Sequence, residues 1–375
     1  MKQNKIFLRV GLSFLFIFIV ATLFLANLSL VSAANEYNLV FKTSPENVVA
    51  HDNPFVEVPE SSYFTLTVEA YDKATNQLAK DVNVQLTVTH DKDSLTLPSG
   101  FPWVEGTTLL VQESFAADGR LTVGKFLFPL RGNYKIHATA ISKDGKSGEL
   151  DTSIYAKQPV FQIRNWALFH GAILLVGLIV GLVYGKSLRN QGKANLSTFL
   201  TAVFLVSIVV LSIQFVAAHE GEEHEEEPHK IELIDKQVEV RTNPEIPDIG
   251  TPTQFNFLFK DETTGKLLDN VKVHFKYENQ EEKFMVIDTE FVSETGNPSL
   301  IYGIFDGAPH KLTLDVEPTE KSSVNFEPIH REYETIMAEA HDPPRTTQFV
   351  ALFIMIMAWL IGLTIGAVLK RTVYS

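Results

Sequence analysis

The sequence predicts a membrane protein with all-β outer domains plus transmembrane α-helices, organised as two β-sandwiches and three transmembrane helices. Three observations support this fold class. Apolar residues are concentrated in long runs, although the mean hydropathy of the 375-residue chain is only +0.06. Two other segments alternate apolar and polar residues with the period of two that is typical of strands. Those two segments also align with each other, which indicates a duplicated unit.

Composition excludes several classes of function. The formal net charge is -13 and there is no basic stripe, so nucleic acid is not an expected partner. The chain has no cysteine, which excludes disulfides, thiolate chemistry, iron–sulfur clusters and cysteine-based zinc sites. The folded domains must therefore be held together by core packing alone.

The first apolar run, residues 10–31, follows three basic residues and precedes Ser32, Ala33 and Ala34. A basic start, an apolar middle and small residues at the end predict a secretory signal peptide over residues 1–34. Because the apolar stretch is long for a signal, an uncleaved anchor is the alternative. Either form sends the residues that follow to the outer side.

Three further runs, 164–185, 195–218 and 346–369, are each long enough to cross a hydrocarbon core of about 30 Å. The loop 186–194 has three basic residues and no acid, and the tail 370–375 has two basic residues. The positive-inside rule makes both cytoplasmic. We therefore expect a multi-pass protein of the cell membrane with both large domains on the extracytoplasmic side.

Glycines recur at spacing four in two of these runs. Gly177, Gly181 and Gly185 lie in the first, and Gly362 and Gly366 in the last. Small residues at this spacing let helix backbones approach closely, so we predict that these two helices touch. Besides membrane lipid, the same faces could bind a membrane-protein partner or a second copy of the chain. The alternative is that glycine is simply common in membrane helices.

The outer segments, 35–160 and 231–328, align over one hairpin without a gap. TLTVEAYDKATNQLAKDVNVQLTV begins at Thr65, and QFNFLFKDETTGKLLDNVKVHFKY begins at Gln254. Asp72 matches Asp261, and Gly265 occupies a turn position where positive φ is expected. A repeat of about seven strands and 100 residues fits an immunoglobulin-like sandwich. Two unrelated β domains are the alternative.

The hairpin pattern D-x-x-T-[NG]-x-L-x-x-[DN]-V-x-V, followed by GNYKI or GAPHKL, resembles extracytoplasmic immunoglobulin-like domains of the YtkA type. Those domains accompany bacterial copper-resistance and copper-import membrane proteins, so the resemblance implies a role in copper handling. The architecture also resembles the B subunit of particulate methane and ammonia monooxygenases. That family binds copper through the amino-terminal histidine of the mature chain and an H-x-H pair. This chain has neither, so no ligand is carried over.

The linker 219–230, HEGEEHEEEPHK, is the most distinctive stretch of the sequence. Its histidines are spaced by five with glutamates between them, and histidine with carboxylate suits zinc or copper. The candidate ligands are His219, Glu220, Glu223, His224 and His229. The alternative is a solvated acidic linker that binds no metal.

The connector 329–345 provides a second candidate metal set. If it is helical, His330, Glu334, Met337 and His341 fall on one face. Histidine, methionine and carboxylate are a plausible copper set. An amphipathic connector without metal is the alternative.

A third arrangement combines histidines at the outer ends of the three spanning helices. His170, His219 and His341 could converge there on a metal or haem, although histidine also suits the polar interface without any ligand. The remaining histidines within strands or at strand ends are interpreted as structural: His90, His137, His274 and His310.

The sequence contains no G-x-S-x-G, phosphate loop or H-E-x-x-H motif, so we do not expect an enzyme. A role as non-catalytic subunit of a metal oxidase or monooxygenase is the one exception. The first functional hypothesis is a membrane-anchored extracytoplasmic binding protein that handles copper or zinc through the His/Glu-rich juxtamembrane segment. The alternative is a non-metal accessory or assembly subunit of a larger membrane complex.

Overall fold

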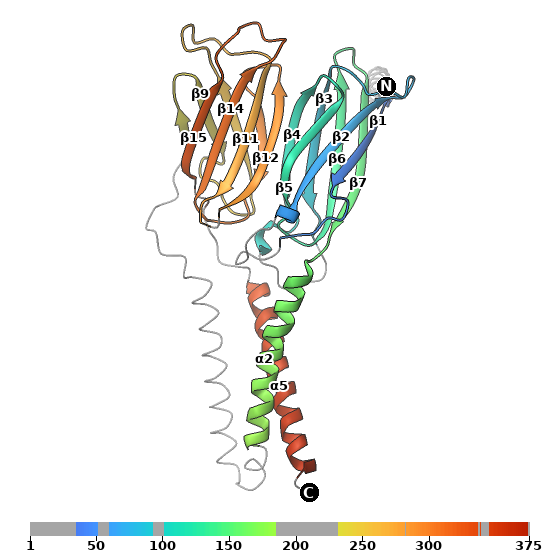
Figure 1. Ribbon diagram of the computed structural model, residues 1–375, viewed down its shortest axis with the longest axis vertical. Coiled ribbons are helices and arrows are strands. Elements are labelled where there is room, and N and C mark those ends of the chain that lie inside the picture. The colour runs from blue at the N-terminus through green and yellow to red at the C-terminus, as the bar shows by residue number, and fades with distance from the viewer. Residues whose placement is uncertain are drawn as a thin grey trace, which may run out of the picture.

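The computed structural model describes residues 35–51, 60–92, 101–184, 232–281, 283–336, 338 and 345–373. Its strands form an elongated β-sheet head, and two helices leave one end of that head (Figure 1). We call this the helix end of the head. The fold is therefore mostly β-sheet with two apolar helices, as the sequence predicts in outline.

The first unit of the head consists of seven strands. Their side chains alternate between the core and solvent; in β3, for example, every second residue from the first valine is buried. Two short 3-10 helices, Glu60–Ser62 and Pro102–Val104, lie between strands. The strands are β1 (Tyr37–Ser44), β2 (Tyr63–Asp72), β3 (Val82–His90), β4 (Thr108–Ala116), β5 (Arg120–Leu127), β6 (Gly132–Ser142) and β7 (Ser147–Ala156).

The second unit repeats this order after a short additional strand. Its long strands alternate in the same way, and β11 is buried at every second position. The strands are β8 (Glu232–Ile234), β9 (Val238–Asn243), β10 (Pro252–Phe259), β11 (Val271–Asn279), β12 (Phe284–Ser293), β13 (Ser299–Gly303), β14 (His310–Pro318) and β15 (Ile329–Ile336).

Both sheets run through both units. One has seven strands in the order β1-β2-β5-β12-β11-β14-β15, and the other has eight in the order β7-β6-β3-β4-β13-β10-β9-β8. The units join where β5 pairs with β12 and β4 pairs with β13, both antiparallel. One hydrophobic core extends between the sheets through both units. Where the sequence suggested two separate sandwiches, the structure has one double-length sandwich, because these strands pair with each other instead of ending at open edges.

Buried polar side chains connect the units at this seam. Gln112 on β4 is fully buried; its Oε1 accepts a hydrogen bond from Thr289 Oγ1 (2.8 Å), and its Nε2 donates to the Glu290 carbonyl oxygen (3.1 Å). The Val292 amide donates to Ser114 Oγ at 2.9 Å. Each of these bonds crosses from one unit to the other. A seam with satisfied buried polar groups favours one fixed register over alternatives.

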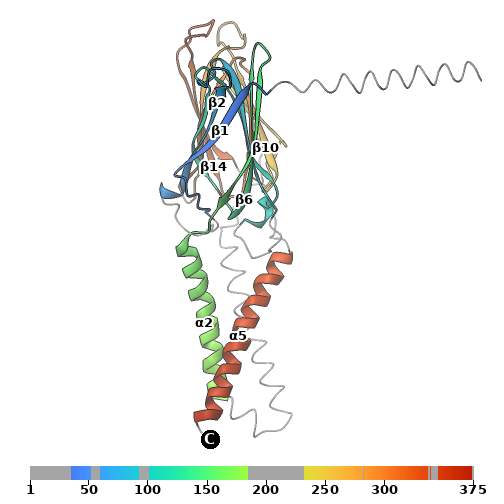
Figure 2. The same cartoon turned by 90° about the vertical axis from the view of Figure 1, so that its right-hand side faces the viewer.

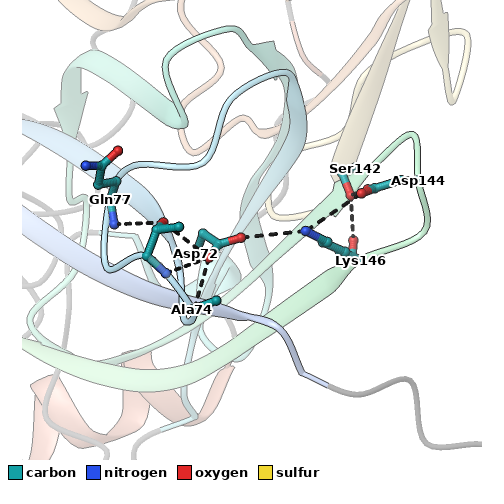
Figure 3. A network of polar contacts seen from close by, with 7 residues as sticks. Asp72, Ala74, Gln77, Ser142, Asp144 and Lys146 are labelled. Atoms are coloured by element: carbon teal, nitrogen blue, oxygen red, sulfur yellow. Dashed lines mark hydrogen bonds and ion pairs between the residues drawn. The ribbon is translucent and has the colours of Figure 1, made fainter.

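The predicted repeat is confirmed at the level of single hydrogen bonds. Asp72 Oδ1 accepts from the Thr75 amide at 2.9 Å, and Asp261 Oδ1 accepts from the Thr264 amide at 2.7 Å. These turns follow β2 and β10, the strands aligned in the sequence. In the first unit Asp72 also approaches Lys146 Nζ at 3.7 Å, which links this turn to the β6–β7 turn (Figure 3).

Positive φ angles occur at matching positions of these two turns. Asn76 and Gly265 have φ of +53° and +67°, as the alignment predicts. Gly119 and Gly296, in later turns of each unit, occupy matching close approaches, because a Cβ at either would lie 2.3 Å from a backbone carbonyl oxygen in the β2–β3 or β10–β11 connection. Local turn chemistry is therefore shared by both copies.

The helices α2 (Val160–Tyr184) and α5 (Arg345–Val373) contain the two described segments long and apolar enough to span a membrane. Their apolar cores, Ile163–Val183 and Phe349–Lys370, have mean hydropathies of 2.3 and 2.5. Figure 2 shows them converging away from the head.

The predicted contact between these helices is confirmed. A Cβ added at Gly177, Gly181, Gly362 or Gly366 would lie 2.0–2.3 Å from a carbonyl oxygen of the other helix. Such an approach requires glycine on both sides, as small-residue packing in membranes predicts. The glycine face of each helix is thus covered by the other helix of the same chain. Gly185 lies outside the described residues.

The prediction of a helix across His330 and Glu334 is wrong. Residues 329–336 form β15, which pairs antiparallel with β14 and closes the edge of the seven-stranded sheet. Ile329 packs into the core while His330 is exposed, so the period is two. The second unit consequently extends beyond residue 328, its expected end.

Several predicted segments lie outside the described residues. They are the signal peptide or anchor at 1–34, the loop 186–194, the apolar run 195–218, the linker 219–230, and the last two residues of the tail. These assignments, including the third transmembrane helix, stay predictions.

Candidate metal centre

The candidate centre lies on the solvent-facing side of the β6–β7 hairpin, at one end of the eight-stranded sheet. Ile136 and Ala138 on β6 are buried, so His137 between them points to the other side of the sheet. The antiparallel register places Asp151 of β7 directly opposite His137, with Glu149 two residues away on the same face. Side chains at such cross-strand positions are neighbours, with Cβ atoms about 4.5–5.5 Å apart when directly opposite.

Three possible ligand atoms converge here. His137 Nδ1 lies 2.9 Å from Asp151 Oδ1 and 3.8 Å from Glu149 Oε1, and all three donor atoms fit within 4.8 Å of one another. One imidazole nitrogen and two carboxylate oxygens suit zinc or copper. The side chains are 40%, 77% and 61% exposed, which leaves water free to complete the coordination. As plain ion pairs, contacts this exposed contribute only about 0–1 kcal/mol.

The sequence interpretation of His137 as a structural histidine missed this cluster. His137 and Asp151 are 14 residues apart and meet only through the register of the hairpin. No linear spacing motif marks such a pair. The available signal was the alternation itself, which places His137 on the solvent side when the two strands are aligned in register.

Among the predicted ligands, His330 lies within the described residues, and it has carboxylate neighbours. It lies on β15, where its Nδ1 is 2.5 Å from Asp315 Oδ1 and its Nε2 is 3.8 Å from Glu332 Oε1. His274, also interpreted as structural, faces the same Asp315 from β11, with its Nδ1 3.8 Å from Oδ2. The structure thus brings His330 together with partners that the sequence did not suggest.

His170 lies in α2 near the head. Its Nδ1 donates to the carbonyl oxygen of Trp166 at 2.9 Å, and its ring lies 3.8 Å, centroid to centroid, from the Trp166 ring. These contacts anchor the imidazole to its own helix. The proposed convergence with two other histidines is untested, because both lie outside the described residues.

The remaining predicted ligands fall in segments that the structure does not describe. This applies to the acidic linker and to the end of the connector alike. They are His219, Glu220, Glu223, His224, His229, Met337 and His341.

Two buried histidines sit at the helix end of the head, where the units meet. His310 stacks on Tyr277 with 4.5 Å between ring centroids, and its Nε2 lies 3.3 Å from Asp306 Oδ1. His51 packs against Phe284, and within the described part of the chain neither of its ring nitrogens has a hydrogen-bond partner. Burial lowers the pKa of His51 to about 4, against a weaker opposing effect of Asp306. This region is a packed junction, not an open centre.

No protein-family model matches the chain, and no curated protein matches it. Among solved structures, the adhesin InvE of Yersinia pseudotuberculosis aligns with 80% of this chain and 60% of its own, at 12% identity and a TM-score of 0.22. Trypsin-activated alpha-2-macroglobulin from Escherichia coli aligns with 80% of this chain and 18% of its own, at 9% identity and a TM-score of 0.22. The chain therefore spans less than two thirds of either protein. Likeness at this level carries no functional argument.

Proposed function

We propose that this chain is a membrane-anchored extracytoplasmic binding protein whose head holds a divalent transition metal ion, zinc or copper. The proposed ligands are His137, Glu149 and Asp151. The observation that supports this most strongly is the convergence of their three donor atoms within 4.8 Å. In this proposal the chain has no catalytic activity of its own.

The anchor consists of α2 and α5. Their length and hydropathy support spanning, and the basic residues beyond their distal ends favour a cytoplasmic location for those ends. The head would then face the extracytoplasmic side. Lipid is the first partner in this arrangement, because large apolar side chains of both helices are exposed.

The acidic segment around His219, His224 and His229 is kept as a separate proposed metal-binding stretch. Short His-rich tracts can bind metal, and this one lies outside the described residues, whereas the structure defines the geometry of the β6–β7 centre. The two can be tested apart by substitution.

The role of accessory subunit is the alternative. The glycine spacing in the spanning helices favours this alternative in part, but in the structure the glycine faces of α2 and α5 pack against each other. A larger complex would have to contact other surfaces of the helices or the head.

Metal binding can be tested with Zn²⁺ titrated against a chromophoric chelator, using the full chain in nanodiscs. His219, His224, His229 and His274 are replaced by Gln throughout, so that neither the acidic linker nor the histidine cluster around Asp315 contributes. Glu149→Gln should weaken binding at this centre at least about tenfold, since even outer-shell changes cost about 10–100-fold. Glu113→Gln, the same change at an exposed residue of β4, is the matched control. Equal affinities for both variants would overturn the proposed centre.

Orientation can be tested separately, because the chain has no native cysteine. A single cysteine replacing Asp118, in the exposed turn between β4 and β5, should react with a membrane-impermeant maleimide in intact cells. Labelling only after the membrane is opened would contradict an extracytoplasmic head.

A further inference from the structure

A second histidine-containing cluster lies in the other unit, on the solvent-facing side of the seven-stranded sheet. A hollow of about 160 Å³ is lined there by His274 on β11, Asp315 on β14 and His330 on β15. The three side chains are only 26%, 33% and 60% exposed, so this place is more sheltered than the β6–β7 centre. Lys272 also lines the hollow, but its charge is paired with Glu290 at 2.8 Å.

The tautomer of His274 is fixed by a partner on the neighbouring strand. Its Nε2 lies 2.6 Å from Asp288 Oδ1, and a hydrogen bond this short to a carboxylate requires Nε2 to carry the proton. In the neutral ring the lone pair is then on Nδ1, which faces Asp315 Oδ2 at 3.8 Å. Two acceptors face each other across that gap, and a cation between them would satisfy both.

This arrangement matches the outer shell of known metal sites. A ligand histidine usually donates its second ring N–H to a carboxylate, which fixes the ring and raises its basicity. Asp288 has this relation to His274.

His330 lies beside this pair, but its donor nitrogen must move to join them, since among the described residues only the His137 cluster has three donor atoms within 4.8 Å of one another. The Nδ1 of His330 is 2.5 Å from the other oxygen of Asp315, so both imidazoles face one carboxylate. Because its side chain is 60% exposed, the ring can turn to direct a nitrogen at an ion seated between His274 and Asp315. The ion would then take the place of the hydrogen bond between His330 Nδ1 and Asp315 Oδ1.

The repeat aligns the two clusters at one position only. In the first unit His90 pairs with Tyr134, and in the second the aligned Asn279 pairs with His310. Counting along from these pairs, Asp315 corresponds to Thr139, and His330 to Glu149.

Glu149 and His330 are therefore the one aligned pair of proposed donors, whereas His274 comes from β11 and has no counterpart in the first cluster. The strand pairs β6–β7 and β14–β15 lie at opposite side edges of the head (Figure 1).

We propose that the second unit binds a divalent transition metal, copper or zinc, through His274, Asp315 and His330. Asp288 acts as a positioning residue, because it contacts His274 and not the ion. Two imidazoles and a carboxylate form a stronger set for these ions than one imidazole and two carboxylates. This second centre does not depend on the His137 centre, and each can fail alone.

The test uses Cu²⁺ added to the full chain in nanodiscs, again with His219, His224 and His229 replaced by Gln. Electron paramagnetic resonance resolves the nitrogen couplings of bound imidazoles. We expect one copper signal with two imidazoles from this centre and one with a single imidazole from the His137 centre.

His274→Gln or His330→Gln should abolish the two-imidazole signal and leave the other intact. Asp288→Asn should weaken copper binding here about 10–100-fold while the signal keeps both imidazoles. Glu113→Gln, at an exposed residue of β4 outside both clusters, should change neither signal. A two-imidazole signal that survives both histidine substitutions would overturn the proposal. Loss of the signal with Glu113→Gln would also overturn it.

His137→Gln separates the two proposals. If it removes the one-imidazole signal and no two-imidazole signal ever appears, the first centre stands and the second falls. If the chain in which only His219, His224 and His229 are replaced shows the two-imidazole signal and no one-imidazole signal, the second centre stands and the first falls.

Discussion

The buried imidazole of His51 makes the stability of the head depend on pH. The side chain is 1% exposed and packs against Phe284 of the other unit, with 5.9 Å between ring centroids. The neighbouring Ala50 amide donates to the Lys157 carbonyl oxygen at 2.8 Å, just before α2 begins. His51 thus lies where both units and the first helix meet. Replacing it with Leu removes the titrating group and keeps an apolar side chain.

The magnitude follows from the pKa of His51, which burial lowers from 6.5 to about 4. Above pH 6.5 the ring is neutral in both the folded and unfolded chain, so it contributes no pH dependence. As the pH falls from 6.5 toward 4, the unfolded ring binds a proton and the folded ring does not. The free energy of unfolding should fall by about 3 kcal/mol over this interval, at ~1.4 kcal/mol per pKa unit.

The assay is urea unfolding of the full chain in detergent at several pH values between about 7 and about 4.5. Trp103 fluorescence reports on the head, with Trp166 and Trp359 in the helices replaced by Phe. His51→Leu and His51→Gln should both flatten the dependence of unfolding free energy on pH by about 2–3 kcal/mol. Curves for both variants that run parallel to the unsubstituted protein would refute this reasoning.

Three further substitutions test the packing. Gln112→Ala removes two hydrogen bonds across the seam, one of them from the buried hydroxyl of Thr289. It should lower the free energy of unfolding by about 2–4 kcal/mol, whereas the same change at an exposed glutamine should cost under ~0.5 kcal/mol in urea titrations. Gly362→Leu should reduce cross-linking between cysteines placed on α2 and α5, because its Cβ would meet a carbonyl oxygen at 2.0 Å, and Gly171→Leu, with open space around it, should not. Gly119→Ala should be about 1–3 kcal/mol more destabilising than Gly145→Ala in thermal melts, since both have positive φ but only Gly119 meets backbone; equal losses would contradict the close approach.

Features with a local signal could be predicted from the sequence. The alternation of β3 and β11 identifies strands, and Asp72 and Asp261 identify the same turn in both units. The contact between α2 and α5 was also predictable, because glycine spacing along one helix is sufficient to define a face. Each of these depends on residues within a few positions of one another.

Features that depend on pairing between distant segments could not be predicted. The joining of β5 to β12 and of β4 to β13 has no local signature, because either strand could equally end at an open edge. The connector around His330 fits a helical period as well as a strand, and the open edge of β14 decides the outcome. The convergence of His137 and Asp151 likewise needs the register of β6 and β7, which the sequence leaves free.

The most direct measurement is the number of copper ions bound per full-length chain, by mass spectrometry of the metal, with His219, His224 and His229 replaced by Gln. We expect two ions. His137→Gln should leave one, His274→Gln combined with His330→Gln should leave the other, and all three together should leave none. A chain that retains no copper at micromolar free metal, or a count that none of these substitutions changes, would contradict metal binding by the head.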